Sequence, residues 1–107
     1  MQTTTQKFAT RPANATEILN QLGGRRFIIM TGTKQLIDMG DGLKIKLTRN
    51  KLGAQFLYIQ LLADDTYLMT FAKIVKFDWV VIEQIPGVYC DQLQTIFTKK
   101  TGLYTHL

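Results

Sequence analysis

The spacing of apolar residues changes its period twice along the chain, and these changes predict the order of the secondary structure. Near the start, Asn14 precedes an apolar stripe at helical spacing, and Gly23-Gly24 follows it. The stripe consists of Ile18, Leu19 and Leu22. Asparagine is favoured at a helix N-cap, and glycine commonly follows the last helical turn. The pattern therefore predicts a helix of about two turns that begins after Asn14.

After Gly24 apolar and polar residues alternate, which is typical of half-buried β-strands. The clearest segment is Leu43–Thr48, where leucine and isoleucine alternate with Lys44, Lys46 and a threonine. This alternation predicts that the two lysines lie on the outward face of the sheet. Turn residues divide the region into five or six strands, with Pro86-Gly87 expected to end the last one. The predicted strands are Arg26–Thr31, Gln35–Met39, Leu43–Thr48, Gln55–Leu62, Tyr67–Ile74 and Trp79–Ile85.

Two of these strands differ in how clearly their faces are assigned. In Gln55–Leu62, the expected buried face is formed by Leu57, Ile59 and Leu61, so the outward residues are Phe56, Tyr58 and Gln60. In Tyr67–Ile74, both alternating sets contain large apolar residues, and the periodicity leaves open which set is buried. The first strand is therefore the better guide to the chemistry of the exposed sheet face.

Beyond Val88 the period returns to 3.6 residues, which predicts a second long helix that ends at Gly102. Its apolar stripe is formed by Tyr89, Leu93, Ile96 and Phe97. Cys90 lies in the expected first turn, next to this stripe. Because free cysteine usually behaves as a small apolar residue, Cys90 is predicted to be buried and unreactive.

The order helix, strands, helix predicts one α+β domain in two layers. The short connections between strands favour an antiparallel meander, since parallel neighbours need long crossovers. The short N-terminal helix and the C-terminal helix are the elements available to cover one face of the sheet. We expect residues 14–107 to form this domain and residues 1–13 to form a flexible arm that ends at Arg11-Pro12.

Composition excludes several kinds of chemistry. The chain of 107 residues has no serine and a single histidine, His106, so a Ser-His-Asp triad cannot be built. One cysteine, no apolar stretch of membrane-spanning length and no secretory signal predict a cytoplasmic protein that does not enter a membrane. A metal-dependent hydrolase is an alternative that would use carboxylates in turns, namely Asp38, Asp41, Asp64 and Asp65. Their spacing matches no calcium loop, and we expect neither a metal nor another cofactor.

Cations and aromatic residues form the remaining pattern of chemical interest. The formal net charge is +5, which favours an acidic partner such as nucleic acid or an anionic protein surface. Sheets that bind single strands combine cations for phosphates with rings on which bases stack. The candidate nucleic-acid-binding residues are Lys44, Lys46, Arg49, Lys51, Phe56, Tyr58, Lys73 and Lys76. Exposed aromatic residues suit a protein interface or a homodimer equally well.

Two segments resemble a group of small proteins of unknown function that bacteriophages and prophages encode. The first runs from Ala15 through Gly23-Gly24 to Lys34, and the second runs from Tyr89 through Phe97 to Thr105. A helix followed by Gly-Gly and a Thr-Gly-Leu-Tyr ending recur in that group. The resemblance implies a phage origin and action in the cytoplasm of a bacterial host, and it carries over no catalytic or binding residue. Such proteins are often nucleic-acid binders or inhibitors of host defence.

The sequence therefore predicts a phage accessory protein that is not an enzyme and that binds nucleic acid through a basic and aromatic sheet face. The alternative is an inhibitor of a host or anti-phage defence protein, acting by protein–protein binding in the manner of anti-CRISPR proteins. The two hypotheses use the same surface and differ only in what covers it.

Overall fold

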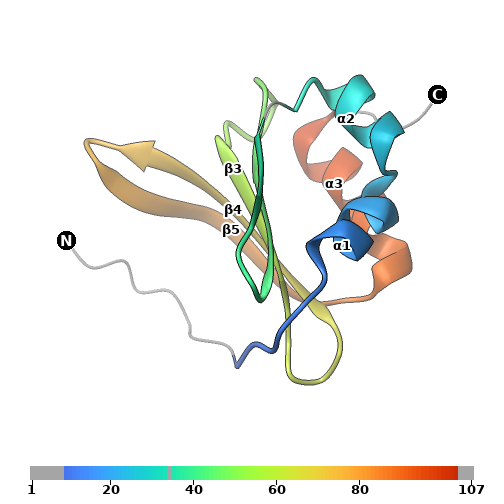
Figure 1. The fold of residues 1–107 in the computed structure, drawn as a ribbon. Coiled ribbons are helices and arrows are strands. Elements are labelled where there is room, and N and C mark those ends of the chain that lie inside the picture. Colours follow the sequence, from blue (N-terminus) through green and yellow to red (C-terminus); the bar gives the residue numbers. More distant parts are fainter. Residues whose placement is uncertain (1–8, 34, 104–107) are drawn as a thin grey trace.

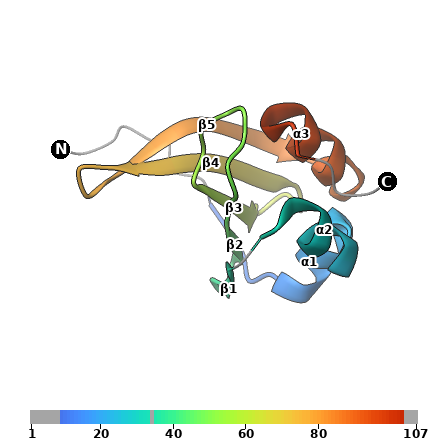
Figure 2. The ribbon, with the colours of Figure 1, turned by 90° about the horizontal axis from the view of Figure 1, so that it is seen from above.

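Five antiparallel strands form the sheet of the protein, and the helices lie together on one of its faces (Figures 1 and 2). The computed structural model describes residues 9–33 and 35–103. The strands follow one another across the sheet in chain order, which confirms the predicted α+β meander with five strands rather than six. The elements are α1 (Ala15–Leu22), α2 (Arg25–Thr31), β1 (Gln35–Asp38), β2 (Gly42–Lys46), β3 (Phe56–Leu61), β4 (Tyr67–Val75), β5 (Asp78–Val88), a 3₁₀ turn (Cys90–Gln92) and α3 (Leu93–Thr101).

The first helix begins and ends as the sequence predicts. The side-chain oxygen of Asn14 accepts hydrogen bonds from the amides of Thr16, at 2.9 Å, and Glu17, at 3.2 Å. These two bonds satisfy amides that have no partner within the helix. At the other end Gly23 adopts a positive φ, and the chain turns directly into α2.

The segment Arg26–Thr31 was predicted to be a strand, and this prediction is wrong. It belongs to α2, in which Phe27 and Thr31 are four residues apart and are both buried, while Ile29 on the opposite side is 70% exposed. The hydroxyl of Thr31 donates to the carbonyl of Phe27 at 2.7 Å. A short apolar run fits a buried strand and a buried helix equally well, and here the packing of Phe27 on α3 favours the helix.

The core lies between the helices and the covered face of the sheet. The rings of Phe27 and Phe97 meet edge to face with their centroids 5.1 Å apart. The register of β3 against β4 pairs Leu57 with Phe71 and Ile59 with Met69, and all four side chains are fully buried. This pairing decides the face of β4 that the sequence left open: Tyr67, Met69 and Phe71 point toward the helices.

Cys90 is exposed, so the prediction of a buried thiol is also wrong. The α-helical phase begins only at Leu93, after a separate 3₁₀ turn. The stripe therefore includes buried Leu93 and Phe97 but not Tyr89, which is 61% exposed. The helix ends as predicted, with Gly102 in the left-handed conformation and its amide bonded to the carbonyl of Thr98.

The last strand is longer than predicted, because β5 continues through Pro86-Gly87 to Val88. Proline is tolerated here since β5 is an edge strand whose outer side needs no donor. Of the predicted arm, residues 1–8 lie outside the described residues, and the rest runs beside the end of β3. The amide of Arg11 donates to Leu61, and the amide of Ala63 donates to Ala9.

Candidate nucleic-acid interface

The face of the sheet opposite the helices is the candidate site, and we call it the open face. Figures 1 and 2 show α1, α2 and α3 on the same side of the sheet, with none of them over the other side. Strand register gives the members of the open face, since residues directly opposite each other in neighbouring strands share a face. They include Lys44, Lys46, Phe56, Tyr58, Gln60, Thr70, Ala72, Ile74, Trp79, Val81 and Gln84.

Two aromatic rings and a lysine meet on the open face. The rings of Phe56, from β3, and Trp79, from β5, have their centroids 5.5 Å apart and are tilted by 36°. The Nζ atom of Lys44, from β2, lies 5.0 Å from each centroid. A cation at this distance over a ring is attracted by the negative face of the π-system. We call these three side chains the cation–aromatic cluster.

A small residue in β4 allows the cluster to form across three strands. Ala72 lies directly opposite Phe56 on one side and Val81 on the other, and it is fully buried. Because neighbouring strands are about 4.8 Å apart, a side chain of β3 reaches one of β5 only if the residue between them is small. The methyl group of Ala72 leaves that space open, and Phe56 and Trp79 meet above it.

The opposite end of the open face carries a negative charge. The carboxylate of Asp41 accepts hydrogen bonds from the Tyr58 hydroxyl at 2.6 Å and from the Gln60 amide at 2.9 Å. Gly42 allows this approach: a Cβ atom at this position would lie 1.9 Å from the carbonyl oxygen of Ile59. The hydrogen bonds join Asp41 to β3 and fix the direction of the Tyr58 hydroxyl.

These contacts shift two pKa values. Burial favours a higher pKa for Asp41, but hydrogen bonds from Tyr58, Gln60 and Thr10 outweigh it, so the pKa of the carboxyl group is lowered. Burial raises the pKa of Tyr58, and the adjacent charge of Asp41 raises it further. At neutral pH the end of the open face near Asp41 is therefore an anion that holds a neutral phenol.

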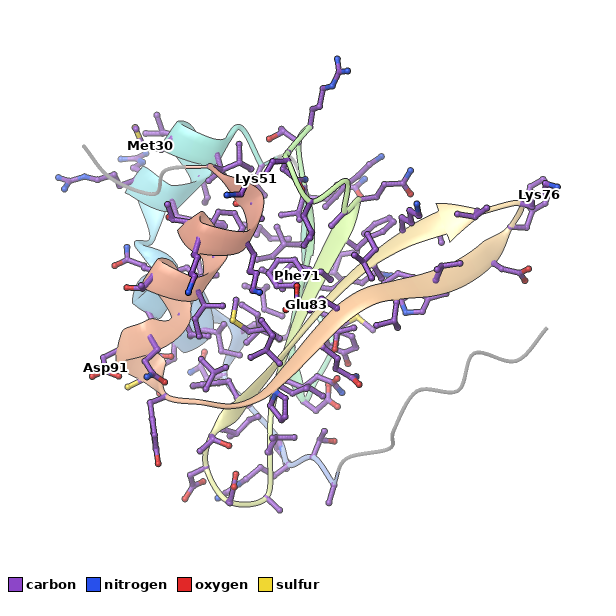
Figure 3. All side chains as sticks on the ribbon, turned by 180° about the vertical axis from the view of Figure 1, so that it is seen from behind. Met30, Lys51, Phe71, Lys76, Glu83 and Asp91 are labelled. Atoms are coloured by element: carbon purple, nitrogen blue, oxygen red, sulfur yellow. The ribbon has the colours of Figure 1, made fainter. Side chains whose placement is uncertain are left out.

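Four of the eight predicted binding residues lie on the open face, and four lie elsewhere. The four on the open face are Lys44, Lys46, Phe56 and Tyr58. Arg49 is exposed in the loop after β2, and the stem of Lys51 packs beside Gly102 at the end of α3. Lys73 follows Phe71 on the covered side of β4, and Lys76 lies at the tip of the β4–β5 hairpin, as Figure 3 shows.

Trp79 was missed as a candidate residue, although it completes the cluster. Its face depends on the register of β5 against β4, and the alternation within Tyr67–Ile74 does not fix that register. The signal lies in the turn: two residues, Lys76 and Phe77, separate the strands, so Trp79 pairs with Ile74. Ile74 shares its face with Ala72, two positions earlier, which places Trp79 on the open face.

The carboxylates considered for a metal-dependent hydrolase are engaged separately. Asp38 accepts from the amide of Gly40 at 2.9 Å, and Asp64 accepts from both the amide and the hydroxyl of Thr66. Asp65 forms an ion pair with Arg11. Within residues 9–33 and 35–103, no three side chains of the histidine, cysteine, aspartate and glutamate types gather as metal ligands would. Asp38 and Asp64 thus stabilise the backbone of their own turns.

Comparisons with protein-family models, curated proteins and solved structures gave no match to this chain. Among the described residues, no helix has the length and apolar character needed to cross a membrane. What the open face can bind is therefore inferred from its own residues and their geometry.

Proposed function

We propose that this protein binds single-stranded nucleic acid through the open face and that it has no catalytic role. The observation that carries the proposal is the cation–aromatic cluster: Lys44 lies over Phe56 and Trp79 on the face opposite α1, α2 and α3. Lys46 is exposed on the same strand, directly opposite Phe56. Rings for bases and cations for phosphates thus lie side by side, as single-strand binding requires.

Binding requires Lys44 to give up its position over the rings, and the energies favour this exchange. A cation–π contact at a partly exposed site contributes about 0.5–1 kcal/mol, so the two contacts of Lys44 together contribute about 1–2 kcal/mol. A base stacked on an aromatic side chain contributes about 1–3 kcal/mol, and the released ammonium group gains a phosphate partner. In the free protein Lys44 covers the rings. In the complex, bases take its place over the rings, and Lys44 moves to a phosphate of the nucleic acid.

The proposed binding site ends before Tyr58. The Asp41 carboxylate that holds the Tyr58 hydroxyl repels phosphate groups, so a bound strand passes over Phe56 and Trp79 rather than over Tyr58. Lys51 and Lys73 lie away from the open face and are not expected to contact a strand on it. With the resemblance to phage proteins, we propose action in the cytoplasm of a bacterial host.

Charge reversals at two positions test the proposal. Lys46→Glu on the open face and Arg25→Glu on α2 change the net charge equally, and both residues are exposed. Only Lys46→Glu should weaken binding to a fluorescent oligonucleotide of any sequence. It should also lower the slope of log K against log salt by about 0.7 for one lost phosphate contact. Equal effects of both variants, or no salt-dependent binding by the natural protein, would contradict the proposal.

A second candidate function is inhibition of a host or defence protein, and the edge strand β1 favours it. All four residues of β1 are exposed, among them Leu36 and Ile37, and neither proline nor lysine protects this strand. The amide of Met39 donates to the carbonyl of Gly42 and therefore points toward β2. Since successive amides of a strand point to alternate sides, the amide of Leu36, three residues earlier, points away from β2. That outward amide is free to pair with a strand of a partner.

Leu36→Pro removes the outward amide without removing a β1–β2 hydrogen bond. If a partner protein adds a strand to β1, this variant should fold but lose the complex, as judged by co-purification with the natural protein as reference. Retention of the same partner by Leu36→Pro would exclude strand addition at β1.

A further inference from the structure

The tip of the β4–β5 hairpin has an exposed apolar surface that extends beyond the cation–aromatic cluster. Beyond Ala72 and Val81, no third strand of the described residues lies beside β4 and β5, because β3 begins at Phe56 opposite Ala72. The two strands continue as a ribbon over residues 73–80 that projects from the body of the protein (Figure 1). Figure 3 shows Lys76 at its far end.

The turn of this ribbon combines backbone strain with complete exposure. Lys76 and Phe77 have φ values of 50° and 71°, in the left-handed region where Asn and Gly are preferred in two-residue hairpins. Phe77 is 100% exposed, and Ile74 and Val75 are 41% and 40% exposed. A bulky aromatic residue in this conformation costs stability, and in the free protein it buries no surface in return. Such strain is typical of a site that meets a partner.

The ribbon extends the proposed binding surface. Trp79 of the cation–aromatic cluster belongs to the ribbon, and Phe77 is two residues from it. Two residues of a chain span at most about 7 Å, the value for an extended strand, and this is also the rise of two stacked nucleotides. A strand that stacks on Trp79 therefore arrives at Phe77 about two nucleotides later.

Apolar and basic residues at the tip occur on both sides of the ribbon. Ile74 lies on the open side, while Val75 and Lys73 lie on the other side. The ribbon carries two lysines, Lys73 and Lys76, against one aspartate, Asp78. Of Ile74, Val75 and Lys73, one strand on the open face would contact only Ile74. The end of a duplex is instead a flat apolar surface two bases wide, with phosphates on both of its sides. The tip matches that surface better than it matches a single strand.

The geometry points to the tip as a wedge for the junction between single-stranded and duplex nucleic acid. This inference rests on the proposed function. The single-stranded tail lies on the open face, and the ring of Phe77 stacks on the last base pair. Lys73 and Lys76 contact phosphates of the duplex end. Apolar side chains commonly act as wedges between base steps in this way.

Three probes test the inference: a duplex with a six-nucleotide tail, the same tail alone and the blunt duplex. The natural protein should bind the tailed duplex about tenfold more tightly than the tail, or by about 1.4 kcal/mol, as one additional stacking contact would give. Phe77→Gly should remove this preference and leave binding to the tail within about twofold. Because glycine accepts a positive φ, the same variant should melt at an equal or higher temperature, which excludes misfolding as the cause.

Ile29→Ala is the matched control, since Ile29 is an exposed apolar residue on α2, and it should retain the full junction preference. If the natural protein binds the tail without preferring the junction, or if Phe77→Gly keeps the preference, the wedge is wrong and the proposed function stands. The apolar tip is then assigned to a protein partner. If no tail binding is seen, the proposed function fails and the wedge fails with it.

Discussion

An aromatic pair lies on each side of the sheet, and the two pairs have opposite surroundings. On the covered side, Phe27 of α2 and Phe97 of α3 meet edge to face, and both are fully buried between the helices and the sheet. On the open face Phe56 and Trp79 meet at a similar distance, but both are only partly buried, and the Lys44 ammonium group lies over them. The first pair excludes water and stabilises the fold. The second keeps its rings within reach of solvent, where they are available to a ligand.

This difference can be measured by truncating one ring from each face. Phe97→Ala should lower the free energy of unfolding by about 3–5 kcal/mol, because it leaves a cavity between α3 and the sheet. Phe56→Ala should lower it by about 1 kcal/mol, because water fills the space beside Lys44. Urea denaturation of both variants provides the comparison. Equal losses would show that the open face is part of the core and not a binding surface.

The covered face was largely predictable from the sequence, because its pattern is local. Leu43 and Ile45 in β2, and Leu57 and Ile59 in β3, alternate with polar or outward residues and are buried as expected. A period of two assigns a face without knowledge of any other strand. The exception is Arg26–Thr31, where Phe27 packs against Phe97, a contact between residues far apart in the chain.

The open face was only half predictable, because its membership depends on pairings between strands. Lys44, Lys46 and Phe56 follow from their own strands. Trp79 requires the register of β5, and the exclusion of Lys73 requires knowledge of which side of β4 faces the helices. Cys90 shows the same limit, since its exposure follows from where the α-helical phase of α3 begins. The alternation of apolar and polar residues within one segment does not reveal how strands pair or where a helix begins.

Acid titration gives a further comparison of the two faces, with a smaller expected change in the free energy of unfolding. Asp41 is a charged group at the edge of the open face. Despite partial burial, the hydrogen bonds from Tyr58 and Gln60 hold its pKa in the folded protein below the ordinary value of 3.8. A carboxyl group with a lowered pKa stabilises the fold above its unfolded-state pKa, and this contribution is lost as the pH falls through the folded-state value. Stability should thus decrease below about pH 4, in part through Asp41.

Asp41→Asn should remove this part of the acid dependence. At neutral pH the variant should be less stable by about 1 kcal/mol, since the amide accepts the bonds from Tyr58 and Gln60 less strongly than a carboxylate does. Its stability should then vary less between pH 5 and about 2 than that of the natural protein. Asp78→Asn, at the exposed end of the ribbon, is the control. If Asp41→Asn leaves the pH profile unchanged, the hydrogen bonds do not stabilise the carboxylate, and Tyr58 is free to join the binding surface.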